Sequence, residues 1–311
     1  MMLDEIKNDY PLLHKTVDHL FNSAPFYKKT LTRLLESNFN FELAERVCKT
    51  GLEMVNDNWE QYFKNLDKLT EMNYEFLRQQ MHLEKTGKYL YNSFKEIEEV
   101  FKQNEEEFGP NYLWGMYFSQ PFWKTHHNFI NMFLENFVQN NKTVGKVLEI
   151  PSGNGFFLCE FLRANPNWHG TGIDLSDASI SFSKELFKAN KIQEKFYTFI
   201  KQDFYDYQGP EEFDMVMCGE FLEHVEDPVK ILTKIHEILK NDGKLFLTVA
   251  IWAAHIDHIY LYKSAEEVRD HVRQAGFSID KELVQASFDK DESDPEKSKI
   301  PASYAAILSK K

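Results

Sequence analysis

Apolar side chains in the first third of the chain recur at steps of three and four residues, and the alternation typical of strands is absent. The recurrence forms one amphipathic stripe: Leu66, Leu69, Phe76, Leu83, Leu90, Phe94, Ile97 and Phe101. This pattern predicts an all-helical domain over residues 1–108 that packs on the rest of the chain. A lid over an active site, or an element that forms a homodimer, is the functional alternative. Phe108-Gly109-Pro110 marks the expected break.

From Lys146 onward the pattern changes to short apolar runs that alternate with helical segments. In chain order we expect an aromatic stretch at 112–123, a lead-in helix at 124–139, strands at 147–150, 170–174, 196–200, 213–218, 244–250, 281–286 and 304–308, and intervening helices that include 179–190 and 228–239. An exposed charged loop, 289–299, separates the last two strands. The alternation predicts an α/β fold for residues 109–311, a doubly wound, Rossmann-like sheet of seven strands with helices on both faces.

Composition and charge narrow the classes of function. The chain has 311 residues and a formal net charge of −13, which disfavours nucleic acid and anionic membranes as partners. Its three cysteines, Cys48, Cys159 and Cys218, form neither a zinc pattern nor a disulfide framework. The N-terminus lacks the features of a signal peptide, and the longest apolar run, 245–254, is too short to span a bilayer. We therefore expect a cytoplasmic protein with no membrane partner.

Glycines and an acid follow the first two predicted strands. Glu149-x-x-x-Gly153-x-Gly155 ends the first strand and opens a helix, and its glycines let a ligand approach the backbone closely. Asp174 closes the second strand, 25 positions after Glu149. An acid at that place typically accepts hydrogen bonds from both hydroxyls of a ribose. These residues are candidates for binding a nucleoside-containing cofactor, and ordinary turn and cap chemistry is the alternative.

A further signal lies at the ends of the third and fourth strands. Asp203-Phe204 follows the third strand, where a carboxylate can accept from an adenine amino group while the ring packs on the base. Cys218 ends the fourth strand at the same edge. It is typical of a buried small hydrophobic residue, and we include it among the candidate cofactor contacts. Together with the glycine turn, these positions indicate an adenosine-containing cofactor.

Residues 125–311 resemble the class I S-adenosylmethionine-dependent methyltransferases. The resemblance is carried by Glu149-x-x-x-Gly153-x-Gly155, Asp174, Asp203, the post-strand segment 219–225 and the segment 239–244 before the fifth strand. It implies S-adenosyl-L-methionine as the cofactor. Nicotinamide dehydrogenases share the fold, but they usually carry G-x-G-x-x-G, which the glycine turn does not complete. Pro151 stands where the family often has glycine, and proline removes an N–H and fixes φ, so the cofactor loop is expected to differ in shape.

Glu220-x-x-Glu223-His224 directly follows the fourth strand, at the edge where methyl group and acceptor should meet. On a helical turn, positions i, i+3 and i+4 share a face, so three ligating side chains would converge. Such a set suits a divalent metal such as Mg²⁺, Mn²⁺, Fe²⁺ or Zn²⁺. The segment resembles that of metal-dependent ubiquinone-pathway O-methyltransferases and small-RNA 2′-O-methyltransferases, which implies a further histidine after the fifth strand. His258 is the expected fourth ligand, with His255 as the neighbouring alternative.

Two readings without metal stay open for the same segment. In one, His224 or His255 is a general base that takes the proton of the acceptor. In the other, the glutamate-histidine pair is structural. We expect an enzyme that transfers a methyl group to an oxygen atom of a small-molecule acceptor. An RNA 2′-O-methyltransferase, which the acidic composition disfavours, and a non-catalytic cofactor-binding scaffold are the alternatives.

Overall fold

The computed structural model describes residues 6–103, 107–139, 143–210, 212–287 and 299–311. The first third of the described chain is helical, as the apolar period predicts. Its elements are α1 (Pro11–Ser23), the 3₁₀ turn η2 (Pro25–Tyr27), α2 (Lys28–Leu35), α3 (Phe41–Met54) and α4 (Trp59–Thr86). The side chains of Asn40 and Asn58 cap α3 and α4 by accepting from the backbone N–H groups of Leu43 and Gln61.

The predicted amphipathic stripe is divided between two helices rather than carried by one. α4 ends at Gly87, which takes the left-handed conformation that terminates helices. The helices that follow are α5 (Phe94–Gln103), the π-helical turn η3 (Glu107–Asn111), α6 (Tyr112–Phe122), α7 (Lys124–Phe133) and the π-helical turn η4 (Leu134–Val138). Leu90 and Phe94, which the pattern places on the buried face, are exposed. Gly109 has non-helical backbone angles, so the helical path is kinked at this glycine, and the domain boundary expected there stays a prediction.

All seven predicted strands are present and form one sheet with the order β3-β2-β1-β4-β5-β7-β6. They are β1 (Lys146–Glu149), β2 (His169–Asp174), β3 (Tyr197–Lys201), β4 (Phe213–Gly219), β5 (Leu239–Ile251), β6 (Phe277–Ala286) and β7 (Ala302–Lys310). The first five strands pair in parallel, and β7 pairs antiparallel with both β5 and β6. The expected doubly wound, Rossmann-like sheet is confirmed.

Two strands, β5 and β6, begin four or more residues earlier than predicted. β5 begins at Leu239 because this residue pairs with Phe213, although 239–243 had the polar and glycine composition of a turn. β6 begins at Phe277 because its first residues pair with the end of β7 across an irregularity between Ile279 and Lys281. The charged loop predicted at 289–299 lies almost entirely outside the described residues. Tertiary pairing thus extends both strands beyond their apolar runs.

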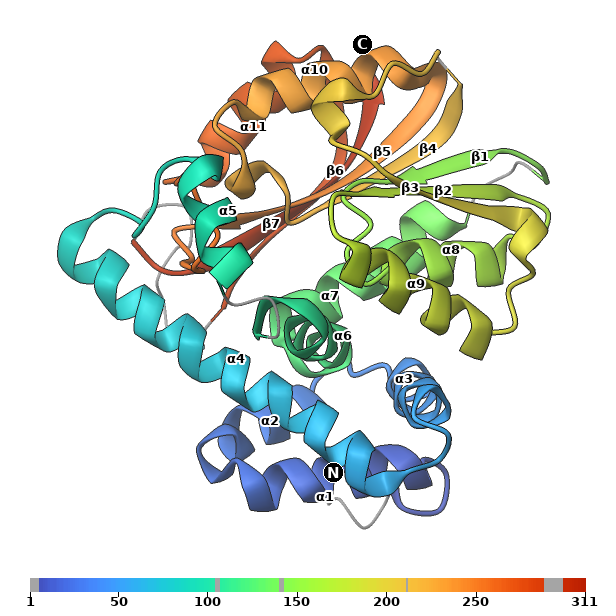
Figure 1. The fold of residues 1–311 in the computed structure, drawn as a ribbon, viewed down its shortest axis with the longest axis vertical. Helices are drawn as coiled ribbons and strands as arrows, with labels where there is room; N and C mark the ends of the chain where they lie inside the picture. Colours follow the sequence, from blue (N-terminus) through green and yellow to red (C-terminus); the bar gives the residue numbers. More distant parts are fainter. Residues whose placement is uncertain (1–5, 104–106, 140–142, 211, 288–298) are drawn as a thin grey trace.

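Helices cover both faces of the sheet (Figure 1). They are α8 (Phe156–Ala164), α9 (Asp177–Ala189), α10 (Pro228–Ile238) and α11 (Ala265–Gln274), with short 3₁₀ turns η5 (Glu194–Phe196), η6 (Phe204–Asp206) and η7 (Leu222–His224). Helices α8 and α9 lie on one face, and α10 and α11 lie on the other. None of the described helices combines the length and apolar character that crossing a bilayer requires.

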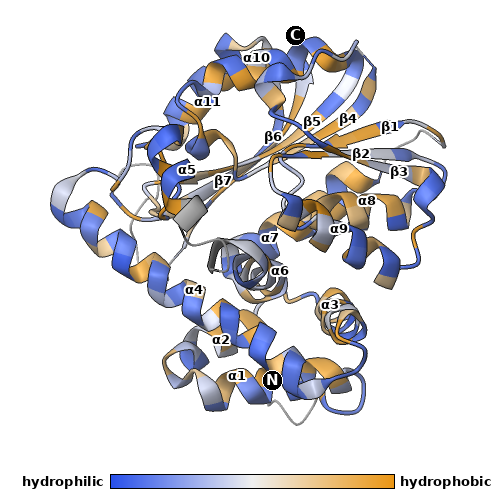
Figure 2. Cartoon of the chain, in the orientation of Figure 1, coloured by the Kyte–Doolittle hydropathy of each residue, from blue (hydrophilic) through white to orange (hydrophobic). Residues whose placement is uncertain are grey.

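The N-terminal helices share a continuous apolar core with one face of the sheet. This core joins Leu66 of α4 and Phe118 of α6 to Leu158 of α8 and Phe246 of β5. In Figure 2 the strands β1 and β4 are largely hydrophobic, whereas hydrophobic and hydrophilic residues alternate along α4 and α8. Leu83, near the end of α4, belongs instead to the core cluster on the opposite face. The last turns of α4 therefore reach the loops at the carboxyl edge of the sheet.

Candidate active site

The glycine turn after β1 is built around the carboxylate of Asp174. Asp174 Oδ2 accepts from the backbone N–H of Gly153 and Oδ1 from that of Ser176, each at 2.8 Å. Burial raises the pKa of the Asp174 carboxyl to about 6, although neighbouring backbone N–H groups partly offset the effect. Gly153 has a φ of +48°, which glycine adopts without the steric cost of a side chain. The turn thus holds a carboxylate and glycine backbone at the ends of two adjacent strands.

The second glycine of the turn is required by packing as well as by its backbone. Gly155 has a φ of +72°, and a Cβ atom built on it would lie 2.7 Å from Ser183 Oγ of α9. Glu149 is buried beneath the turn, where its Oε2 accepts from the backbone N–H of Leu158 at 3.3 Å. Burial raises the pKa of the Glu149 carboxyl well above its usual value. The predicted motif therefore forms a tightly packed turn at the carboxyl edge.

The remaining cofactor candidates have structural partners of their own. Asp203 caps the turn η6 because its Oδ1 accepts from the backbone N–H of Tyr205 at 2.8 Å. Phe204 is buried, and its ring stacks on that of Tyr207 with the centroids 6.0 Å apart. Cys218 is a fully buried free thiol in the apolar core. Asp203 stays a candidate for binding the adenine amino group of the cofactor, whereas Phe204 and Cys218 contribute mainly to the core.

The segment after β4 does not form the helical turn on which convergence of its three ligands was predicted. Glu220 has a φ of +44°, and only Leu222–His224 form a short 3₁₀ turn. The backbone N–H of Glu220 donates to the Thr248 side chain at 3.0 Å. The i, i+3, i+4 geometry was therefore wrong for Glu220, because its backbone bends at the strand end before any helix begins.

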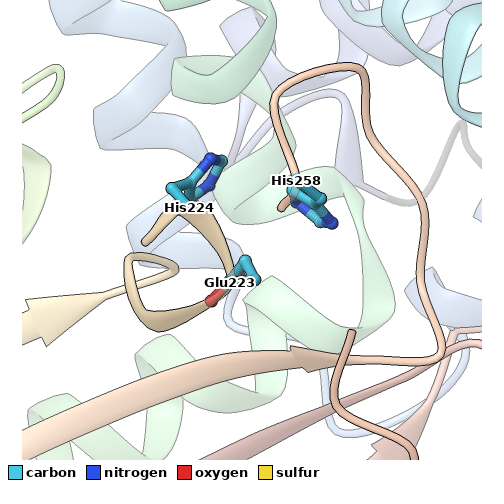
Figure 3. A group of neighbouring side chains, drawn as sticks. All are labelled: Glu223, His224 and His258. Atoms are coloured by element: carbon cyan, nitrogen blue, oxygen red, sulfur yellow. The ribbon is translucent and has the colours of Figure 1, made fainter. Parts of the chain in front are cut away.

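Three of the four predicted ligands nevertheless meet. Glu223, His224 and His258 each offer one ligand atom, and these atoms lie within 4.8 Å of one another. Figure 3 shows that Glu223 and His224 come from the turn after β4 and His258 from the loop after β5. β4 and β5 are parallel neighbours, so their carboxyl ends lie at the same edge. Glu220 is outside this group of three, which we call the Glu-His-His cluster.

The carboxylates of this region are buried and incompletely paired. Glu223 is fully buried, and its Oε1 accepts from the backbone N–H of Ala250 at 3.1 Å. Its other oxygen, Glu223 Oε2, and Glu220 Oε1 are buried without a hydrogen-bond partner. Burial raises the pKa of both carboxyls, and repulsion from Glu220 raises that of Glu223 further. A cation or a proton between the two oxygens would relieve both penalties.

Both imidazoles of the cluster are held by backbone carbonyls through the same ring nitrogen. His258 Nδ1 lies 2.9 Å from the carbonyl oxygen of Ala253, and His224 Nδ1 lies 3.1 Å from that of Asp257. A carbonyl only accepts, so each Nδ1 carries a proton, and Nε2 is the ring nitrogen that is left for a metal ion. Burial lowers the pKa of His258 to about 3, so this ring is neutral at physiological pH. Neutral, oriented imidazoles are the form that binds a metal ion.

Sequence reasoning missed Asp257, which lies between two of the histidines. Its Oδ1 accepts from Nδ1 of His255, and its Oδ2 lies 3.5 Å from Nδ1 of His224. Burial alone would lower the pKa of His255, but the Asp257 carboxylate outweighs it and raises the pKa. His255, the predicted alternative ligand, thus forms an ion pair beside the cluster. The signal was available, because an acid stood between two histidines in the sequence.

Aromatic side chains from the N-terminal half lie against the cluster. The ring of Tyr89 packs edge-on against His258, and that of Tyr112 lies against His255, each with the centroids 5.4 Å apart. Burial, and then the nearby carboxylates, raise the pKa of both phenols. These rings come from residues on either side of α5. Tyr89 and Tyr112 therefore cover part of the edge of the sheet at which the cluster lies.

Comparison with known proteins agrees with this geometry. Residues 148–245 match the family model described as a methyltransferase domain. The structure of the mitomycin 7-O-methyltransferase MmcR is similar, with a TM-score of 0.52 and 14% identity, covering 76% of this chain and 68% of that chain. A likeness at this identity concerns the fold. The chain thus contains a class I S-adenosylmethionine-dependent methyltransferase domain.

Two curated relatives give a closer sequence likeness over part of the chain. The ubiquinone biosynthesis O-methyltransferase of Actinobacillus pleuropneumoniae serotype 5b (strain L20) is 31% identical over 106 residues, which is 33% of this chain and 44% of that protein. The carboxy-S-adenosyl-L-methionine synthase of Nautilia profundicola is 31% identical over 127 residues, which is 40% of this chain and 51% of that protein. The match thus spans about half the length of these relatives or less.

Proposed function

We propose that the chain is an S-adenosylmethionine-dependent methyltransferase that methylates an oxygen atom of a small-molecule acceptor beside a bound divalent metal ion. The observation that carries the proposal is the position of the Glu-His-His cluster. It follows β4 and β5, while the glycine turn and Asp174 follow β1 and β2. In the order β2-β1-β4-β5, two strand spacings, about 10 Å, separate Asp174 from the end of β4. A methyl donor bound along this edge would reach the cluster.

The cofactor would be bound by backbone and carboxylate groups of the glycine turn. Asp174 would accept from the ribose hydroxyls, and Asp203 from the adenine amino group. A Cβ atom built on Gly153 would meet no atom within 4 Å, so its absence leaves open space in which a ligand can approach the backbone. These groups align the sulfonium methyl with the acceptor oxygen, and alignment of this kind is a large part of the rate gain in transfer between two bound reactants.

The residues of the cluster fit a divalent ion. One carboxylate and two imidazoles in the Nδ1–H form provide an oxygen and two nitrogen donors, and Glu223 Oε2 is buried without a partner. This donor set favours Mn²⁺, Fe²⁺ or Zn²⁺ over Mg²⁺, which prefers oxygen. When bound, such an ion lowers the pKa of an acceptor hydroxyl, which supplies a nucleophile near neutral pH. Glu220 would remain beside the ion and add negative charge.

The ion pair of His255 and Asp257 supports a second mechanism for the same reaction. An imidazole oriented by a carboxylate is a common general base, and His255 lies beside the Glu-His-His cluster. In this mechanism one histidine takes the acceptor proton, and the two buried glutamates share protons instead of a cation. The two mechanisms differ in their response to chelators, which makes them separable by experiment.

The surroundings of the cluster support a small acceptor. Tyr89 and Tyr112 are half-buried beside His258 and His255, and aromatic walls of this kind suit a planar, apolar molecule. The net charge of −13 disfavours RNA as the acceptor. Three free, buried thiols are consistent with a reducing cytoplasm as the location. Release of adenosylhomocysteine with a panel of small phenols, in the presence of Mn²⁺, tests the proposal, and no release with any acceptor and no binding of S-adenosylmethionine would refute it.

Replacing Asp174 by Asn is expected to weaken S-adenosylmethionine binding by about 1–3 kcal/mol, the range for losing charge-assisted hydrogen bonds. Asn retains the size of the side chain but has one acceptor oxygen and no charge. Isothermal titration calorimetry measures the change. Asp177→Asn, on the exposed first turn of α9, is the matched control and should bind normally. Unchanged affinity in the Asp174 variant would remove this carboxylate from the cofactor site.

Cofactor affinity is also expected to depend on pH through Asp174. Burial raises the pKa of the carboxyl in the cofactor-free protein to about 6, and the ribose hydroxyls bind best to its ionised form. The affinity for S-adenosylmethionine should therefore be constant above pH 6 and fall about tenfold per pH unit below it. The dependence should be flatter in Asp174→Asn, which does not titrate. Equal pH profiles of the dissociation constant for both proteins would exclude Asp174 as the titrating group.

A further inference from the structure

The loop that carries His255, Asp257 and His258 is held at its start by a side chain from α4. Gln80 Nε2 donates to the carbonyl oxygen of Trp252 at 3.1 Å, and Gln80 Oε1 accepts from the backbone N–H of Ala254 at 3.0 Å. Gln80 is buried, with 3% of its surface exposed. A primary amide is the side-chain group that can satisfy a carbonyl and an N–H two residues apart at the same time.

The peptide between these two hydrogen bonds orients a ligand of the Glu-His-His cluster. The carbonyl oxygen of Ala253 accepts from Tyr89 Oη at 2.8 Å and from His258 Nδ1 at 2.9 Å. Trp252 has a φ of +47°, an unfavourable backbone conformation for a bulky residue, so the loop needs external partners to keep this path. Gln80 supplies two of these partners: its Nε2 binds the carbonyl before Ala253, and its Oε1 binds the N–H of the peptide group that carries the Ala253 carbonyl.

We infer that Gln80 is a positioning residue: by fixing the Ala253 carbonyl it holds His258 in the Nδ1–H form, with Nε2 free to bind the metal. The part of this inference that concerns the ion rests on the proposed function. The part that concerns the tautomer of His258 does not. It explains why an amide is buried at this point of α4. Through this contact the N-terminal helices act on the metal site in addition to covering it.

Gln79 provides a matched control on the same helix. It is equally buried, and its side-chain amide donates to Glu75 Oε1 within α4. Replacing either glutamine by methionine keeps the approximate length and volume and removes the amide. A purely structural contribution of a buried amide would affect both variants alike. An effect confined to Gln80→Met would identify the contact with the loop as its cause.

The first measurement is the ¹⁵N imidazole spectrum of the metal-free protein, with the His258 signals assigned by their loss in His258→Gln. The native protein should give the Nδ1–H pattern for His258. Gln80→Met should give a mixture of the two neutral tautomers, and Gln79→Met the native pattern. Gln80→Glu, which keeps the oxygen that accepts from Ala254, should give an intermediate pattern and serves as the test if Gln80→Met does not fold.

The second measurement is the affinity for Mn²⁺, read by calorimetry alongside that for S-adenosylhomocysteine. Gln80→Met should weaken Mn²⁺ binding about 10- to 100-fold, the usual effect of removing a group that orients a ligand, and leave the cofactor analogue unaffected. Folded Gln80 variants with the native His258 tautomer would overturn the inference. Absence of Mn²⁺ binding by the native protein would instead refute the metal in the proposed function, while the tautomer measurement would still decide the role of Gln80.

Discussion

Glu223→Gln is expected to lower kcat/KM for methyl transfer about 10³-fold, which corresponds to about 4 kcal/mol of transition-state stabilisation. The reason is that Glu223 belongs to the Glu-His-His cluster and that its Oε2 is a buried carboxylate oxygen without a hydrogen-bond partner. Glutamine fills the same volume but brings no charge to the ion. The fold should survive, because a neutral side chain is less costly to bury than a carboxylate.

Initial rates of adenosylhomocysteine release, together with the metal content of the purified protein, measure this effect. Glu237→Gln, on the exposed side of α10, is the matched control and should keep native activity. S-adenosylmethionine affinity should change little in either variant, because Asp174 lies two strand spacings away from the end of β4. Native turnover by the Glu223 variant would exclude this carboxylate from the chemistry.

His258→Ala and His255→Ala are expected to differ in a way that separates the two mechanisms. If the Glu-His-His cluster holds a metal, His258→Ala should weaken Mn²⁺ binding at least about 100-fold and abolish turnover, since one of three ligands is lost. His255→Ala should still bind Mn²⁺, because His255 pairs with Asp257 and stands outside the cluster. If His255 is instead the general base, His255→Ala should abolish turnover and His258→Ala should retain it.

Calorimetric titration of each metal-stripped variant with Mn²⁺, followed by a rate measurement, distinguishes these outcomes. His169→Ala, at the half-buried start of β2, controls for the loss of a histidine as such. If His255→Ala alone is inactive and Mn²⁺ affects no variant, the metal has to be abandoned in favour of the His255–Asp257 pair.

The fold could be predicted largely from the sequence because its signals are local. The three- and four-residue period of the N-terminal helices and the short apolar runs of β1 and β4 depend on which face each residue buries. Errors arose where distant residues decide the structure. Leu239 extends β5 because Phe213 lies opposite, and Gly87 divides the apolar stripe by ending α4.

The candidate site was predictable where one strand end defines it and less so where loops meet. Glu223 and His224 follow β4 directly, but the backbone bends at Glu220, and this residue lies outside the Glu-His-His cluster. Two histidines stood in the loop after β5, and the tertiary fold places His258 in the Glu-His-His cluster. The contact of Gln80 joins residues more than 170 positions apart, and no periodicity of the sequence signals such a pair.

The decisive experiment is turnover by metal-stripped protein, measured as adenosylhomocysteine release from S-adenosylmethionine with a small phenolic acceptor before and after adding back Mn²⁺, Fe²⁺, Zn²⁺ or Mg²⁺. We predict that the stripped protein binds S-adenosylmethionine normally but releases product only at background rate, and that one equivalent of a suitable ion restores turnover. Full turnover by protein that contains no metal, unaffected by added ions, would show that Glu223, His224 and His258 serve another purpose.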